Sequence, residues 1–280
     1  GVDREACALY KEALDELLAE HGGFNHNVQT LRTLDRLETR YADHPGLNLS
    51  YEVREGIARH ESSGAEFDPW EFPQGVAPTL EAAIVDVADE IAYNSHDIDD
   101  GLASGLLALA ELRENTICAR ALEQTRDEHP ESDETLLRYG LVRKLVGWQI
   151  KDLVESIDHT LGREKIVSVE SLRRYPGKVA VFSAAMGEEL GQLRMFLNER
   201  LYRHPKVMAM ARAGRETVTL VFRSFLEHPG RMPESYASRA GEDPPHAAVR
   251  DYVAGMTDRY AERLAHGITG KSPSPPDESP

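Results

Sequence analysis

Residues 80–102 read LEAAIVDVADEIAYNSHDIDDGL, a stretch that combines the pattern of a long helix with several acidic side chains. It contains no proline, and Thr79 just before it is suited to cap the N-terminus of a helix. Apolar residues recur at helical spacing, which favours a helix with buried sides. We expect the following residues to supply those sides: Ala82, Ile84, Val85, Ala88, Ile91 and Ala92.

Acidic and phenolic side chains of this stretch fall along one stripe of the helix. Each residue advances roughly 100° around a helix, so Asp89, Tyr93 and Asp97 drift by only about 40° per step. Asp86 lies one turn earlier. Carboxylates between apolar flanks cost free energy unless a cation or a hydrogen-bonding ligand compensates them. The pattern favours a metal or polyol site, and the alternative is a solvated acidic face on a surface helix.

Most of the remaining chain also has helical periodicity, and its strand signals are thin. The stretch 61–78 is rich in glycine and proline and is expected to be a loop. The end of the chain, 270–280, holds four prolines and three serines and is expected to be disordered. We therefore predict an all-α fold with one helical domain over 1–269 and a disordered tail. Further helices are expected at 5–21, 27–40, 51–60, 103–111, 115–127, 133–161, 168–173, 184–201, 206–227 and 245–266.

The charge of the chain excludes some classes of partner. There are 48 acidic and 32 basic residues, which gives a net charge of −16. Duplex nucleic acid and anionic membrane surfaces are both bound through cationic side chains, so we expect neither as a partner. No apolar run approaches the roughly 18 residues that a membrane span needs. Cys7 and Cys118 cannot form a disulfide framework or a thiolate zinc site, so we expect a reduced, cytoplasmic location.

Four blocks of sequence follow one another in a recognisable order. They are HGGFNHNVQTLR at 21–32, PGLNLSYEVREGIARH at 45–60, the stretch at 80–102 and DYVAGMTDRYA at 251–261, with a weaker fifth block, FLNERLYRHPKV, at 196–207. In this order they resemble the deoxyguanosinetriphosphate triphosphohydrolase-like family of the HD-domain superfamily. Because the four blocks reach from residue 21 to residue 261, the resemblance covers nearly the whole chain.

This resemblance implies a helical, HD-domain-like phosphohydrolase scaffold and a divalent metal ion such as Mg²⁺ or Mn²⁺. In the family the ion is held by a histidine, a His-Asp pair and a later aspartate. The implied activity is metal-dependent hydrolysis of a deoxynucleoside triphosphate to the deoxynucleoside and inorganic triphosphate. Family members generally form homo-oligomers, so the expected partners are a deoxynucleoside triphosphate and further copies of the chain.

Individual residues take their expected roles from the same resemblance. Asp89, in the segment ADEIAY, matches the later aspartate and is expected to bind the metal ion. Tyr93 matches a residue that packs against the deoxyribose, and Asp97 matches one that hydrogen-bonds a sugar hydroxyl. His26 resembles a histidine that faces the phosphates, where it would donate a proton to the leaving group or stabilise charge. A cap or loop role for His26 is the alternative.

The chain departs from the family pattern on its N-terminal side. No histidine precedes His21, and the one His-Asp dipeptide, His96-Asp97, lies inside the helix that carries Asp89. We expect the first histidine and the His-Asp pair to lie outside this chain, in N-terminal metal-binding helices of a longer parent enzyme. With Asp89 alone, the chain should bind a divalent ion poorly. Two alternatives are a non-catalytic, nucleotide-binding or regulatory protein of the same fold and an HD-type nucleotidase that acts on monophosphates.

Overall fold

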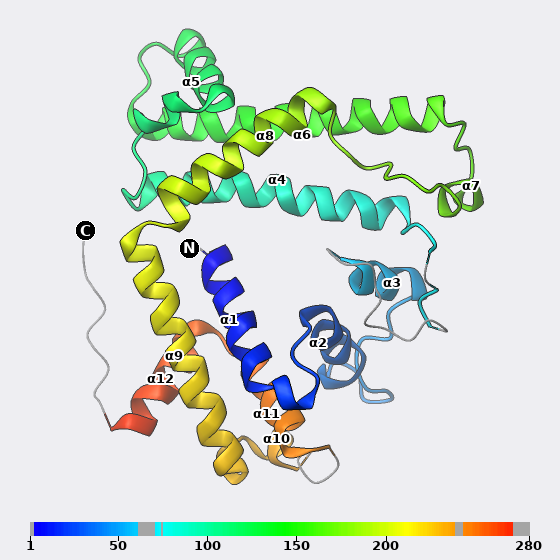
Figure 1. Ribbon diagram of the computed structural model, residues 1–280, viewed down its shortest axis with the longest axis vertical. Helices are drawn as coiled ribbons and strands as arrows, with labels where there is room; N and C mark the ends of the chain where they lie inside the picture. The colour runs from blue at the N-terminus through cyan, green and yellow to red at the C-terminus, as the bar shows by residue number, and fades with distance from the viewer. Residues whose placement is uncertain (1–2, 61–70, 74, 239–242, 271–280) are drawn as a thin grey trace. The chain divides into compact units, whose positions relative to one another are not determined.

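The structure, a computed structural model, consists of helices and connecting segments, with no strand in the residues that it describes (Figure 1). Those residues are 3–60, 71–73, 75–238 and 243–270. The all-α prediction is confirmed. The described residues group into two compact units, one of residues 48–207 and one that combines 3–47 with 208–270. The single domain over 1–269 stays a prediction, and the expected tail beyond residue 270 lies outside the described residues.

The first unit is organised around two long antiparallel helices, α4 and α6 (Figure 1). In chain order its elements are α3 (Tyr51–Arg59), α4 (Leu80–Ala103), η3 (Glu111–Glu114), α5 (Thr116–Glu128), α6 (Glu134–Arg163), α7 (Val169–Arg173), α8 (Ala184–Leu197) and the π-helical segment η4 (Asn198–Tyr202).

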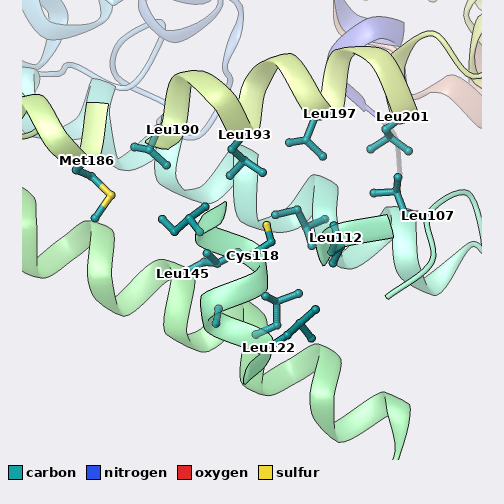
Figure 2. Close-up of a cluster of buried hydrophobic side chains, with 14 of the residues drawn as sticks. Leu107, Leu112, Cys118, Leu122, Leu145, Met186, Leu190, Leu193, Leu197 and Leu201 are labelled. Carbon is teal, nitrogen blue, oxygen red and sulfur yellow. The ribbon is translucent and has the colours of Figure 1, made fainter. Parts of the chain in front are cut away.

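A leucine-rich core joins α8 and η4 to α5 and α6 (Figure 2). Its residues recur every three or four positions along α8 and η4, so one face of this segment is buried. The fully buried members on these four elements include Leu190, Leu193, Leu197, Leu201, Cys118 and Leu145. Because this packing removes their side chains from water, it supplies much of the free energy that holds the helices of the unit together.

The helix expected over 103–111 is not formed. Instead, α4 continues to Ala103, and the chain then turns at Gly105, where φ is +68°. Glycine accepts this left-handed backbone without steric cost, so it ends the helix. The amide of Leu107 donates to the carbonyl of Gly101 at 2.9 Å, which folds the turn back onto α4.

The second unit combines elements from both ends of the chain. They are α1 (Asp3–Leu17), η1 (Ala19–His21), α2 (His26–Arg32), the π-helical segment η2 (Thr33–Leu37), α9 (Pro205–Glu227), η5 (Pro229–Arg231), α10 (Glu234–Ala237), α11 (Pro245–Ala254) and α12 (Asp258–Thr269), with the first residues of α9 assigned to the first unit. Leu14 of α1 clusters with Phe222 of α9 and Val249 of α11 in its core. The helix expected over 245–266 is in fact two helices, because α11 ends at Ala254 with Gly255 as its C-cap, and Thr257 is the N-cap of α12.

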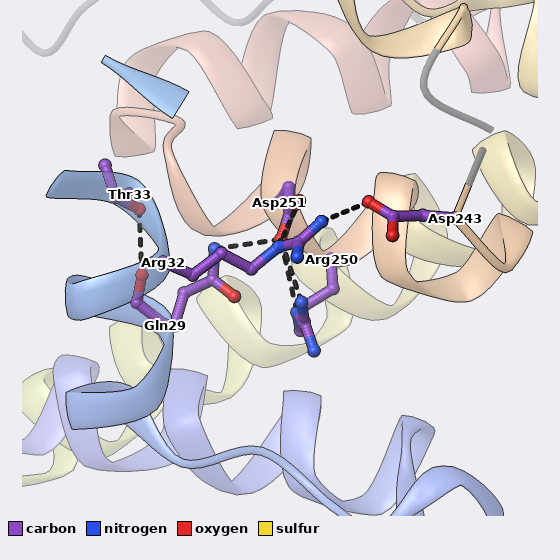
Figure 3. A network of polar contacts seen from close by, with 6 residues as sticks. All are labelled: Gln29, Arg32, Thr33, Asp243, Arg250 and Asp251. Carbon is purple, nitrogen blue, oxygen red and sulfur yellow. Dashed lines mark hydrogen bonds and ion pairs between the residues drawn. The ribbon is translucent and has the colours of Figure 1, made fainter. Parts of the chain in front are cut away.

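An ionic network in the second unit surrounds the buried carboxylate of Asp251 (Figure 3). Asp251 of α11 is almost fully buried and accepts hydrogen bonds from Nε of Arg32 at 2.7 Å, Nη2 of Arg250 at 3.0 Å and Nε2 of Gln29 at 3.1 Å. Arg32 also pairs with Asp243. Burial alone would lower the pKa of Arg32, but its hydrogen bonds to the two aspartates outweigh burial and raise that pKa. The blocks 21–32 and 251–261 are thus joined in space by their charged side chains.

None of the helices in the described residues combines the length and the apolar content that crossing a bilayer would require.

The Asp251 network generates a prediction about stability. Asp251→Ala would leave the guanidinium groups of Arg32 and Arg250 without their shared buried carboxylate, so we expect a loss of about 3–5 kcal/mol in the free energy of unfolding. Urea denaturation followed by circular dichroism measures this loss. The control is Asp258→Ala, which removes an exposed aspartate of α12 and should change the unfolding free energy by less than about 0.5 kcal/mol. Equal stability of the two variants would contradict a structural role for the network.

Candidate functional site

The helix α4 positions the predicted site residues of the first unit. Its N-terminus is capped by Thr79, whose Oγ1 accepts a hydrogen bond from the amide of Ala82 at 3.2 Å. The helix runs without interruption through Asp89, Tyr93 and Asp97. The structure therefore confirms the helical frame that the sequence predicts, with the three side chains on one rigid element.

Most acidic side chains of the middle and C-terminal parts of α4 are held by a partner from another element. Nδ1 of His60, at the end of α3, lies 2.6 Å from Oδ1 of Asp86. Arg194 of α8 pairs with Glu90. The hydroxyl of Tyr202 in η4 donates to Oδ2 of Asp97, and Arg138 of α6 lies 3.0 Å from Asp99. Each of these carboxylates is thus compensated within the unit.

Asp89 differs from these neighbours because its carboxylate is exposed and has no hydrogen bond or ion pair within the described part of the chain. The other acids of the stripe stabilise the packing of α4, whereas Asp89 has no such function in the structure. An exposed carboxylate on a rigid helix is available to a cation or a donor that comes from outside the unit.

The face of α4 beside Asp89 is apolar and exposed, which corrects the expectation that its apolar residues are buried. Ile84 is 36% exposed and Val85 is 60% exposed, and Ala88 and Ala92 are exposed as well. Ile91 is buried, because it lies on the opposite side of the helix and packs in the core with α6. Helical periodicity identifies apolar residues but does not tell which of them a neighbouring element covers.

Tyr93 and Asp97 are the more buried members of the predicted substrate-binding set. Tyr93 is half-buried, and Asp97 is only 4% exposed and hydrogen-bonded to Tyr202. The hydroxyl of Tyr202 therefore holds the carboxylate of Asp97 in place within the first unit. The role of Asp97 in binding a sugar hydroxyl stays a prediction.

Metal-ligating side chains do not gather around Asp89 in the described residues. No group of three or more His, Cys, Asp or Glu side chains in that part of the chain is placed to hold a metal ion. One carboxylate replaces too little of the hydration of a divalent ion to bind it firmly. The residues described here therefore do not make a complete metal site.

His26, the predicted catalytic histidine, belongs to the second unit. It is the first residue of α2, half-buried, directly after the N-cap residue Asn25. Oδ1 of Asn25 accepts hydrogen bonds from the amides of Asn27 and Val28, so Asn25 and not His26 caps the helix. The catalytic role of His26 stays a prediction.

Two residues that contact the acidic stripe were not singled out from the sequence. His60 ends the block PGLNLSYEVREGIARH, and Tyr202 lies in the weaker block FLNERLYRHPKV. Their positions within these blocks were the one sequence feature that could have marked them as candidate site residues. The contacts with Asp86 and Asp97 depend on how α3 and η4 pack against α4, which local patterns do not reveal.

Comparison with known proteins shows where this sequence belongs. A model of the phosphohydrolase-associated domain matches residues 180–266. A deoxyguanosinetriphosphate triphosphohydrolase-like protein of Leptospira interrogans is 36% identical over 264 residues, which cover 92% of this chain and 68% of that protein. Proteins of the same name from Geobacter sulfurreducens and Nitrosomonas europaea are 38% and 39% identical over 90% of the chain, covering 66% and 68% of their own lengths. The chain thus spans about two thirds of the length of these relatives.

The different surroundings of Asp89 and Asp97 predict different effects of their substitution on protein stability. Asp89→Asn should change the free energy of unfolding by less than about 0.5 kcal/mol, because the carboxylate is exposed and unpaired in the described residues. Asp97→Ala should cost about 1–3 kcal/mol, because it removes a buried acceptor from the hydroxyl of Tyr202. Urea unfolding of both variants tests this contrast, which a large loss in the Asp89 variant would refute.

Proposed function

Because the chain belongs to the deoxyguanosinetriphosphate triphosphohydrolase-like family, we propose that it takes part in the hydrolysis of deoxynucleoside triphosphates to the deoxynucleoside and inorganic triphosphate. The observation that carries the proposal is the exposure of one acidic side chain of α4. Among the stripe residues Asp86, Asp89 and Asp97, Asp89 is the exposed one with no partner in the described residues. A residue with no structural partner on an otherwise compensated stripe is a candidate for ligand binding.

We propose that Asp89 supplies one carboxylate ligand to a divalent metal ion, such as Mg²⁺ or Mn²⁺. In this proposal the remaining ligands come from residues outside those described, where the family pattern has a histidine and a His-Asp pair. The described residues hold no group of three or more side chains placed to bind a metal ion. A divalent ion in such a site would supply charge stabilisation for the phosphates and a water molecule of lowered pKa.

Substrate recognition falls to Tyr93 and Asp97 in this proposal. The ring of Tyr93 would pack against the deoxyribose and leave no room for a 2′-hydroxyl group. The carboxylate of Asp97, held in place by Tyr202, would accept a hydrogen bond from the 3′-hydroxyl group. A nucleotide without a 3′-hydroxyl would lack this hydrogen bond and should bind more weakly.

His26 would act on the leaving group. When water attacks the α-phosphorus, the bond between that phosphorus and the 5′-oxygen breaks, and the 5′-oxygen needs a proton. Protonated His26 would donate it, or would stabilise the developing negative charge. A cytoplasmic location, which is expected from the low cysteine content, and assembly into homo-oligomers, which the family resemblance implies, complete the proposal.

The test is to incubate the full-length protein with deoxynucleoside triphosphates and Mn²⁺ and to separate the products by anion-exchange chromatography. We expect inorganic triphosphate and deoxynucleoside in equal amounts. Asp89→Ala should abolish their release, whereas Tyr93→Ala should raise the dissociation constant of the nucleotide. The matched control is Glu81→Ala, which removes an exposed carboxylate from the first turn of the same helix and should leave turnover unchanged.

Other results would select the alternatives. Orthophosphate released from deoxynucleoside monophosphates, without triphosphate, would identify a nucleotidase. Nucleotide binding without any product would identify a non-catalytic, nucleotide-binding protein, which the incomplete ligand set in the described residues favours as the second candidate. Normal triphosphate release from the Asp89 variant would refute the role assigned to that residue.

A further inference from the structure

Two histidine rings lie face to face in the second unit. His21 is the last residue of η1 and is exposed, and His246 is the second residue of α11 and is half-buried. Their ring centroids are 3.7 Å apart and their planes differ by 3°, so the two imidazoles form a parallel stack. Because the two residues are far apart in the sequence, this stack joins the N-terminal segment of the unit to its C-terminal part.

The surroundings of the stack favour the neutral form of its imidazoles. Neither ring forms an ion pair with a carboxylate in the described residues. Arg250, one turn further along α11, donates two hydrogen bonds to the buried carboxylate of Asp251, at 3.3 and 3.0 Å, which hold its guanidinium group in place (Figure 3). Burial, together with the charges of His21 and Arg250, lowers the pKa of His246.

Acidic side chains on the neighbouring segments do not offset this effect. Several of them are bound by other groups, namely Glu12, Asp15, Glu16 and Asp243. Two more are exposed and form no ion pair in the part of the chain that the structure describes, namely Glu20 of η1 and Glu234 of α10. A protonated imidazole in the stack therefore lacks the adjacent carboxylate that would stabilise it.

Protons bind to such a pair in two steps. One imidazolium can remain stacked on a neutral imidazole, because a positive charge is attracted to the face of an aromatic ring. A second proton would place two like charges at the 3.7 Å separation of the rings, with the charge of Arg250 nearby. Since the pKa of His246 is lowered, the folded chain binds fewer protons than the unfolded chain. The contact is therefore stable above about pH 6.5, the ordinary pKa of histidine, and loses stability as the pH falls below it.

The stack holds one end of the turn that leads into α2. Gly22 and Gly23 follow His21 in the left-handed conformation, with φ of +93° and +79°. The amide of Gly23 donates to the carbonyl of Leu18 at 2.9 Å, and the amide of Phe24 donates to Oδ1 of Asp15 at 2.8 Å. The helix α2 begins two residues after Phe24. Release of η1 from α11 would therefore free the segment that carries these two hydrogen bonds.

We propose that His21 and His246 form a pH-sensitive clamp, which holds η1 on α11 while at least one ring is neutral and releases it when both are protonated. The clamp would loosen the turn before α2 in acid and restore it at neutral pH. A consequence for His26, the first residue of α2, rests on the proposed function, whereas the clamp itself does not.

The test measures amide hydrogen exchange of the full chain between about pH 8 and pH 5 by NMR, with the amides of Gly23 and Phe24 as reporters. Their protection, corrected for the pH dependence of intrinsic exchange, should fall at least about tenfold as the second ring takes up its proton. His21→Phe keeps an aromatic ring in the stack but cannot be protonated. In this variant the protection should change by less than about twofold over the same range.

A second measurement follows the ring resonances of His246 during the same titration. His21→Phe should raise the pH at which His246 is half protonated, because the charge of His21 is one cause of its lowered pKa. The matched control is His228→Phe, which replaces an exposed histidine of the same unit outside the stack. It should keep the parental pH dependence of exchange and the parental titration of His246.

Protection that does not change with pH in the parent protein would overturn the proposal, and so would an equal loss of protection in His21→Phe or an unchanged titration of His246 in that variant. If His21→Phe does not fold, His246→Phe is expected to remove the pH dependence from the other side of the stack, and its persistence there would equally overturn the proposal. Neither measurement requires a nucleotide, so the clamp is decided separately from the proposed function.

Discussion

Burial of carboxylates on α4 is the constraint on which the first unit depends. A carboxylate that is partly or fully removed from water is costly unless a donor or a cation faces it. On α4, Asp97 is buried, and Asp86, Glu90 and Asp99 are half-buried. The structure meets this requirement with donors from four separate elements: His60 after α3, Arg138 of α6, Arg194 of α8 and Tyr202 of η4. Each compensating contact also ties one of these elements to α4, so the acidic helix is the centre around which the others are positioned.

The same constraint explains why Asp89 stands out. Its neighbours on the stripe are occupied by structural partners, and its own carboxylate faces outward beside the exposed apolar residues Val85, Ala88 and Ala92. In the second unit, Arg32 is a charged residue that does have partners. Its guanidinium group forms ion pairs with Asp251 and Asp243. Asp89 thus differs from Arg32 in having no partner among the described residues.

Local patterns predicted many of the helices, because periodicity, capping residues and glycines act over a few residues. The start of α4 at Leu80 after Thr79 is one example. Two helix predictions were wrong. The helix expected over 103–111 is not formed, because the chain turns at Gly105, and the helix expected over 245–266 is interrupted at Gly255. They also assigned Ile84 and Val85 to the buried side, since periodicity does not identify which face of a helix receives a neighbour.

The amino-acid sequence by itself determined that the protein is helical and that Asp89, Tyr93 and Asp97 lie along one side of one helix, because helix geometry follows from spacing alone. The family, too, could be read from the order of its sequence blocks. Only the tertiary structure decided that Asp97 is buried against Tyr202, that Asp86 meets His60 and that Asp89 is left exposed. These outcomes depend on contacts between residues far apart in the chain, and such contacts form only when the helices pack.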